Sequence, residues 1–224
     1  MSIKKFYIKE AIKFGWEKMK NNFWIMVAVL VIAWLTTALP TWLQQAAGEK
    51  IPTLSFLLVI ISIVVQFLIS IGLIKIALKL HDNQKPEISD LFLGYSLFLN
   101  YLIVSVLYAL ITIAGLILLI VPGIIWGIKY QFAPYLVIDK GMGPIEAIKK
   151  SGRITKGTKW HLFLFGLLGG LINIAGVIAL AVGLFATVPT IMVATAFVYR
   201  KLLDYPEAAT EPKPAIPAPP APTI

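Results

Sequence analysis

The chain has 224 residues, of which 58% are hydrophobic and 14% charged, and its mean hydropathy is +0.84. Soluble domains carry about 25% charged residues, so this composition excludes an ordinary water-soluble domain and indicates an integral membrane protein. The 20 Lys and Arg outnumber the 11 Asp and Glu, which gives a net charge of +9. The absence of Cys excludes disulfides, thiolate nucleophiles and Cys metal sites.

Uncharged runs mark the membrane segments. They cover 21–48, 51–74, 91–128 and 160–199. A crossing helix needs about 20 apolar residues, so the last two runs are each long enough for two crossings. Val121-Pro122-Gly123 breaks the third run, and Gly183 with Pro189 breaks the fourth.

We therefore expect an all-α, polytopic membrane bundle of about six transmembrane helices. They lie near 23–39, 54–74, 97–121, 124–138, 162–182 and 185–199. The fourth and sixth are short enough to be kinked spans or re-entrant half-helices, so the expected number lies between four and six.

The positions of Lys and Arg predict the orientation. Apart from Lys50 and Lys129, all of them lie in the N-terminal, 75–96, 139–159 and C-terminal segments. The positive-inside rule then places both termini in the cytoplasm, and 44–52 and 122–123 outside. No small-residue cleavage site follows the first apolar run, so we expect that span to be a retained anchor.

Two basic segments have the pattern of amphipathic helices. In 145–156 the apolar and small residues share one half of the helical wheel, and a similar pattern covers 6–20. We expect interfacial helices whose basic residues contact anionic lipid headgroups, with a solvated linker helix as the alternative. These basic residues are Lys149, Lys150, Arg153 and Lys156 in the second segment, and Lys9 and Lys13 in the first.

Short stretches of sequence also recur. Glu10-Ala11-Ile12-Lys13 reappears at 146–149, and the stretch 110–115 resembles 171–176. This predicts three parallel copies of a surface helix followed by a two-span hairpin, although apolar sequences also match by chance. The domain of residues 1–203 would then contain the repeats 4–80, 86–138 and 144–203.

After Leu203 the composition changes. Residues 204–224 contain seven Pro in 21 residues and almost no large apolar side chain. This is typical of a disordered cytoplasmic tail, with a proline-reading partner as a less favoured alternative.

One region carries a family resemblance. It contains Val121-Pro122-Gly123-Ile124-Ile125, Tyr130, Pro134, Asp139, Gly143, Glu146-Ala147, Lys150-Ser151 and Thr155-Lys156-Gly157. The pattern resembles uncharacterised bacterial membrane families similar to the membrane domain of glycerophosphodiester phosphodiesterase, most strongly over 113–165. The resemblance implies an all-helical bundle in a bacterial plasma (inner) membrane. In relatives that are enzymes a separate soluble domain carries catalysis, so that activity is not transferred to this chain.

The sequence contains no catalytic or cofactor-binding constellation. His81 and His161 are isolated, and no metal pair, Walker loop or nucleophile motif is found. All 11 acidic residues lie outside the central apolar stretches, which disfavours proton-coupled transport. We therefore expect no enzyme activity, no cofactor and no metal.

Three polar residues lie within the expected spans. Lys129 is six residues past Gly123, so we expect its side chain to extend to the outer surface, with a ligand-facing position as the alternative. Gln66 and Asn173 lie near the middle of their spans, where an amide usually bonds to a neighbouring helix.

Two classes of function remain. The favoured one is a non-enzymatic membrane protein that organises lipid, or supports a partner membrane protein, through a basic cytoplasmic collar. Its expected partners are anionic phospholipid and a membrane protein, not nucleic acid. The alternative is a transporter of small solutes or lipid, with a central cavity lined by Gln66, Lys129 and Asn173.

Overall fold

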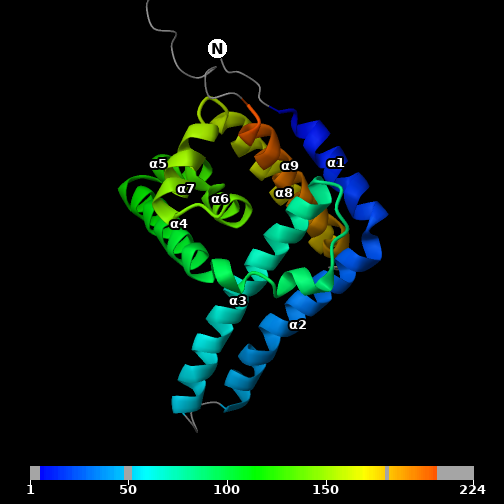
Figure 1. Ribbon diagram of the computed structural model, residues 1–224, viewed down its shortest axis with the longest axis vertical. Coiled ribbons are helices and arrows are strands. Elements are labelled where there is room, and N and C mark those ends of the chain that lie inside the picture. The colour runs from blue at the N-terminus through cyan, green and yellow to red at the C-terminus, as the bar shows by residue number, and fades with distance from the viewer. Residues whose placement is uncertain (1–5, 48–51, 180–181, 206–224) are drawn as a thin grey trace, which may run out of the picture.

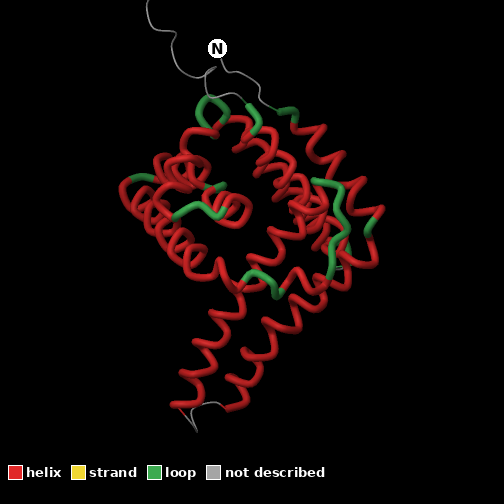
Figure 2. The backbone as a smooth tube through the Cα atoms, viewed as in Figure 1, coloured by secondary structure: helices red, strands yellow, loops and turns green. Residues whose placement is uncertain are grey.

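The computed structural model describes residues 6–47, 52–179 and 182–205. Every regular element in these ranges is a helix (Figure 2), which confirms the all-α class. The α-helices are α1 (Ile8–Asn21), α2 (Phe23–Ala47), α3 (Pro52–His81), α4 (Phe98–Leu118), α5 (Ile120–Tyr130), α6 (Ala133–Lys140), α7 (Pro144–Ile154), α8 (Lys159–Ile178) and α9 (Leu184–Leu203). Two short 3-10 helices, η2 (Ile88–Leu91) and η3 (Tyr95–Leu97), precede α4.

Four helical segments are long and apolar enough to cross a membrane. They are Phe23–Gln45, Thr53–His81, Ile88–Leu118 and Lys159–Ile178, within the described residues. They overlap the first, second, third and fifth expected crossings. The chain is therefore a multi-pass membrane protein with four candidate spans.

The other two expected crossings are not among these four. The segment 124–138 is divided between α5, with 11 residues, and α6, with 8. At 1.5 Å per residue neither is long enough to cross, because the chain turns between them. The sixth corresponds to α9, which is 20 residues long but contains Pro189 and ends in basic residues.

The C-terminal half of α9 lies at the centre of the hydrophobic core. Phe197, Val198 and Tyr199 are buried there, and α1, α3 and α8 pack against α9. Figure 1 shows α1 and α9 side by side. The close contact requires Gly15, because a side chain there would collide with the backbone carbonyl oxygen of Thr190.

Helices α4 and α5 form a tight hairpin joined by one extended residue, Leu119. Gly115 and Gly123 allow the close approach, since a Cβ on Gly115 would lie 2.8 Å from the Cα of Gly123. The Tyr108 hydroxyl donates to the Gly127 carbonyl at 3.1 Å. Helix α5 therefore runs back along only the second half of α4.

The hairpin of α2 and α3 projects from the rest of the molecule (Figure 1). The outer loop expected at 44–52 falls partly outside the described residues, as does the tail beyond residue 205. The elements follow the expected repeat order, except that η2 and η3 replace the surface helix of the middle unit. The repeat itself stays a prediction.

Candidate functional site

A basic pocket lies between α5 and α7. Its volume is about 550 Å³. Its lining consists of Lys129 and Tyr130 from α5 with Ile148, Lys149, Gly152 and Arg153 from α7. Three of the six lining residues are cations and none is acidic, so the pocket has the charge of an anion-binding site.

The sequence of α7 explains its position. Pro144 lies in the first turn, where its fixed φ suits the start of a helix. Arg153 lies in the last turn, where its positive charge interacts favourably with the helix dipole. Ala147, Ser151 and Ile154 recur at helical spacing and are buried against the protein. The predicted amphipathic pattern is therefore correct, but the apolar face of α7 packs on protein. Its exposed arc carries Lys149 and Arg153.

Hydroxyl groups join α7 to the end of α5. The carbonyl of Lys129 accepts hydrogen bonds from the Ser151 Oγ and the Thr155 Oγ1, each at 3.0 Å. The Phe132 N–H donates to the Ser151 Oγ at 3.3 Å. Carbonyls in the last turn of a helix have no hydrogen-bond partner within the helix. The two hydroxyl groups supply partners for the carbonyl of Lys129 and so fix its backbone.

The side chain of Lys129 extends over α7 at Gly152. A Cβ on Gly152 would lie 3.1 Å from the Lys129 Cε and 3.4 Å from the Tyr130 Cε1. The Lys129 Nζ also lies 4.7 Å from the centroid of the Tyr130 ring, within the range of a cation–π contact. The missing side chain at Gly152 thus leaves room for the side chain of Lys129, which passes over this position.

This placement differs from the expected one. Lys129 is the penultimate residue of α5, whereas Pro122 and Gly123 lie in its first turn. The side chain lies beside the basic residues of α7, so Lys129 cannot reach the outer surface if α7 is cytoplasmic. The expected extension to the outer surface stays a prediction, because it depends on the side of the membrane that α7 faces. Helix α7 returns to the end of α5, a contact between residues 22 apart.

The cations of the pocket have no ion-pair partner among the residues that the structure describes. In the described part of the chain, no carboxylate pairs with Lys129, Lys149 or Arg153. Elsewhere, Asp90 is 2.6 Å from the Lys79 Nζ. Because like charges repel, gathering three cations on one surface favours a bound anion.

A second cluster of charges, by contrast, is internally paired. Arg200 donates to Asp139 at 2.7 Å and to Asp82 at 2.6 Å, and the Tyr199 hydroxyl donates to Asp139 at 2.9 Å. Burial alone would raise the pKa of Asp82, but hydrogen bonds from His81 and Arg200 outweigh it and lower that pKa. This cluster joins the ends of α3, α6 and α9. Among the described residues, no three His, Asp or Glu side chains are arranged to hold a metal.

The remaining expected headgroup contacts lie outside the basic pocket. Lys9 and Lys13 border an apolar groove of about 600 Å³ between α1 and α8, lined by Ile8, Ile12, Trp16, Leu168 and Ile172. Lys150 is half-buried on α7, and Lys156 is exposed just beyond its end. Neither lines the pocket between α5 and α7.

The three residues of the expected central cavity do not meet. Gln66 lines a pocket between α2 and α3 together with Thr37, Thr41 and Ser62, whereas Lys129 lines the basic pocket. Asn173 lies on α8, and its buried Oδ1 accepts no hydrogen bond from the described residues. The transporter alternative therefore loses the cavity on which it depended.

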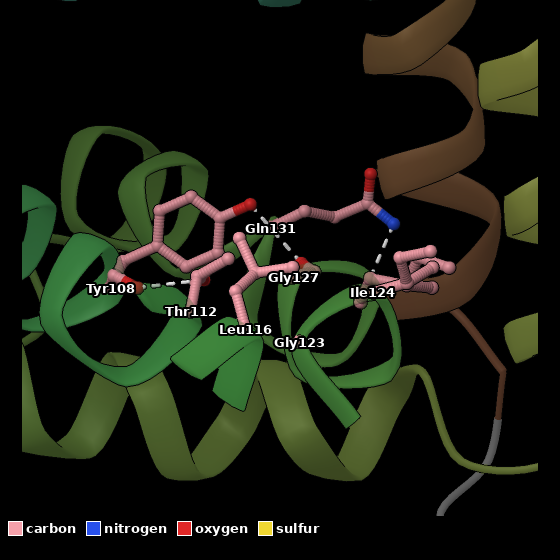
Figure 3. A pocket seen from close by; sticks show the side chains of 8 residues that line it. Tyr108, Thr112, Leu116, Gly123, Ile124, Gly127 and Gln131 are labelled. Atoms are coloured by element: carbon pink, nitrogen blue, oxygen red, sulfur yellow. Dashed lines mark hydrogen bonds between the residues drawn. The ribbon is translucent and has the colours of Figure 1, made fainter. Parts of the chain in front are cut away.

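A smaller pocket of about 270 Å³ lies between α4 and α5 (Figure 3). The Thr112 hydroxyl donates to the Tyr108 carbonyl at 2.8 Å, and the Gln131 Nε2 donates to the Ile128 carbonyl at 3.0 Å. With the bond from Tyr108 to Gly127, its polar groups are largely paired. It contains no charged residue, so we interpret it as part of the packing between two helices.

Sequence reasoning missed the residues that build the basic pocket. Ser151, Gly152 and Thr155 fall on the apolar half of the helical wheel, where small polar residues signal a buried contact. The sequence therefore contains a sign that this face of α7 is buried. It contains no sign that the partner is Lys129, because nothing in the sequence indicates which chain segment α7 contacts.

Comparisons with known proteins assign no activity to this chain. Residues 109–205 match the model of a family described as a protein of unknown function, DUF975. This range includes α5, α7 and the whole basic pocket. The expected likeness to an uncharacterised family is thus confirmed over residues 109–205, while the likeness to the phosphodiesterase membrane domain stays a prediction.

Two curated relatives are uncharacterized proteins of Mycobacterium tuberculosis and Mycobacterium bovis. Each is 26% identical over 154 residues, which is 68% of this chain and 47% of the relative. The chain therefore spans about half the length of the curated relatives it matches. No solved structure matches.

Proposed function

We propose that this protein is a non-enzymatic, multi-pass membrane protein that binds anionic phospholipid at the basic pocket. Through the bound lipid it organises the surrounding membrane or holds a partner membrane protein. The observation that supports the proposal is the gathering of Lys129, Lys149 and Arg153 around one pocket without a carboxylate. Each Lys or Arg near an anionic leaflet contributes about 1 kcal/mol.

The proposal includes an orientation. The basic pocket would face the cytoplasmic leaflet of a bacterial plasma membrane, with both termini on the same side, as the distribution of Lys and Arg favours. A phosphate group suits the site because its oxygens accept hydrogen bonds from an ammonium and a guanidinium at once.

Native mass spectrometry of the detergent-extracted protein tests the proposal. The wild type should retain phosphatidylglycerol in preference to phosphatidylcholine. Lys129→Gln, Lys149→Gln and Arg153→Gln should each lower phosphatidylglycerol retention about five-fold, the factor that corresponds to roughly 1 kcal/mol.

Lys85→Gln is the matched control. It removes the same charge from an exposed position that does not line the basic pocket, so it should leave retention unchanged. Equal retention of both lipids by the wild type, or unchanged retention by the triple Gln variant, would contradict the proposal.

A further inference from the structure

An apolar groove adjoins the basic pocket. It has a volume of about 440 Å³ and lies between α5 and the first turns of α8. Its lining consists of Val121, Ile124, Ile125 and Ile128 from α5 with Lys159, Trp160 and Phe163 from α8. The Trp160 and Phe163 rings stack with their centroids 5.3 Å apart, so one wall of the groove is a flat aromatic surface.

The groove and the basic pocket meet at α5. Ile128 lines the groove, and the next residue, Lys129, lines the basic pocket. From Ile128 the groove follows α5 back to Val121, seven residues away, which is about 10 Å along the helix axis. Val121 is 65% exposed, so the groove opens at its far end. The basic pocket and the apolar groove therefore border the same end of α5.

Three classes of ligand would use the basic pocket and the apolar groove differently. A soluble anion would use only the cations. An apolar peptide segment would use only the groove. A molecule with an anionic phosphate and a long hydrocarbon chain would use both, with the phosphate beside Lys129 and the chain along α5.

We propose that the basic pocket and the groove form one site for a single anionic phospholipid, with the headgroup between α5 and α7 and one acyl chain between α5 and α8. This rests on the proposed function and deepens it, because it assigns the ligand a chain and a direction. Burial of apolar surface against Ile125 and Trp160 supplies affinity that the headgroup alone does not.

Polar substitutions in the groove test the proposal. Ile125→Asn and Val121→Asn place an amide at two points of the groove and alter side chains that are 38% and 65% exposed. Ile117→Asn is the matched control on α4, because Ile117 is 80% exposed and does not line the groove. Native mass spectrometry measures retention of phosphatidylglycerol with oleoyl chains. A ³¹P NMR titration measures binding of glycerophosphoglycerol, which has the same headgroup and no chain.

Both groove variants should retain about ten-fold less phosphatidylglycerol, the loss that corresponds to roughly two buried methylene groups. Ile117→Asn should retain the wild-type amount, and all three should bind glycerophosphoglycerol as the wild type does. If Ile117→Asn also lost phosphatidylglycerol, retention would depend on lipid contact over the whole membrane surface and not on the groove, which would overturn the assignment. Weaker binding of glycerophosphoglycerol by the groove variants would also overturn the assignment, because it would show that the substitutions disturb the headgroup-binding pocket.

Failure of this inference is distinguishable from failure of the proposed function. If Lys129→Gln loses phosphatidylglycerol while both groove variants keep it, the groove assignment is wrong and headgroup binding stands. If Lys129→Gln keeps phosphatidylglycerol, the proposed function itself is contradicted.

Discussion

Individual cations in this protein have two kinds of surroundings. Arg200 is surrounded by carboxylates, with Asp139 and Asp82 both within hydrogen-bond distance. Lys129 instead lies beside a tyrosine ring and the basic residues of α7. The first arrangement is satisfied within the protein, and the second would be satisfied by the anionic phospholipid that we propose. This difference, rather than the number of basic residues, separates the structural cluster from the candidate site.

The pair of Asp82 and Arg200 should make stability depend on pH. The native pKa of Asp82 is lowered, so the pair stabilises the fold above the ordinary value of 3.8 and loses its effect as the pH falls through the native pKa. Asp82→Asn should cost about 0.5–1 kcal/mol at pH 7, a small value because the side chain is 35% exposed and screened by solvent.

Thermal unfolding in detergent, followed by tryptophan fluorescence, measures this effect. The difference in Tm between Asp82→Asn and the wild type should be present at pH 7 and should shrink as the pH falls below 3.8 and through the lowered native pKa of Asp82. A difference that stays constant across this range would show that the carboxylate charge is not involved.

Ser151 should contribute to stability through the bond between α5 and α7. Ser151→Ala removes the acceptor of the buried Phe132 N–H and one donor to the Lys129 carbonyl. An unsatisfied buried group costs about 1–3 kcal/mol, so Tm should fall. Ser62→Ala is the control, because the Ser62 hydroxyl donates to Leu58 within its own helix. Equal Tm values for the two variants would argue against the role of Ser151.

At the scale of helices, periodicity predicted which residues face outward but not what the other face touches. The apolar faces of α1 and α7 were expected to lie on the membrane. Part of each face is buried instead against neighbouring helices, through Ala11 and Gly15 in α1 and Ala147 in α7, while Trp16 of α1 stays exposed. An apolar stripe has the same pattern whether lipid or protein covers it. Small residues in the stripe were the sign that a helix comes close.

The packing of α1 on α9 predicts a strong effect at Gly15. Gly15→Ala places a methyl group against the backbone of Thr190 and Ala194, which cannot move as a side chain can. We expect a loss of about 1–3 kcal/mol in stability. Gly170→Ala is the matched control, because nothing lies within 4 Å of a Cβ there. Chemical denaturation in mixed micelles compares the two, and a Gly15→Ala protein as stable as Gly170→Ala would contradict the packing.

The number of crossings shows the limit of composition as a guide. Uncharged length predicted the spans in α2, α3, α4 and α8. It marked 124–138 as short enough for a kinked span or a half-helix but did not place the turn between α5 and α6, because the same apolar residues suit one long helix or two short ones. The basic residues of the candidate site were predicted from the sequence. Their contact with Lys129 was not predicted, because it depends on how α5 and α7 pack in the tertiary structure.

At the scale of the whole molecule, α3, α6 and α9 end at one place. Each is the last helix of a predicted repeat, and Arg200 at the end of α9 donates hydrogen bonds to Asp139 at the end of α6 and to Asp82 just after α3. Asp139 and Arg200 are 61 residues apart, the same spacing as the recurrence of 110–115 at 171–176. The leading element of each unit, η2, α7 or α1, packs on α3, α6 or α9 respectively. Three repeated units closed into a ring would have this arrangement, and the repeat stays a prediction.

The proposed orientation makes a separate prediction. With no native Cys, single cysteines at Lys85 and Gln45 report on the two sides of the membrane. In inverted vesicles, Lys85→Cys should react with an impermeant maleimide, whereas Gln45→Cys should react only in right-side-out spheroplasts. The reverse pattern would place the basic segments outside and contradict the positive-inside assignment.

Photo-crosslinking tests the central claim, that anionic phospholipid binds at the basic pocket, most directly. Phosphatidylglycerol with a photoactivatable headgroup is incorporated with the full chain, and the crosslinked residues are identified by peptide mass spectrometry. Crosslinks should concentrate at 129–130 and 148–153 and should disappear when Lys129, Lys149 and Arg153 are replaced by Gln. Crosslinks spread evenly over all basic segments, including the loop at Lys85, and unchanged in the triple variant would contradict the account.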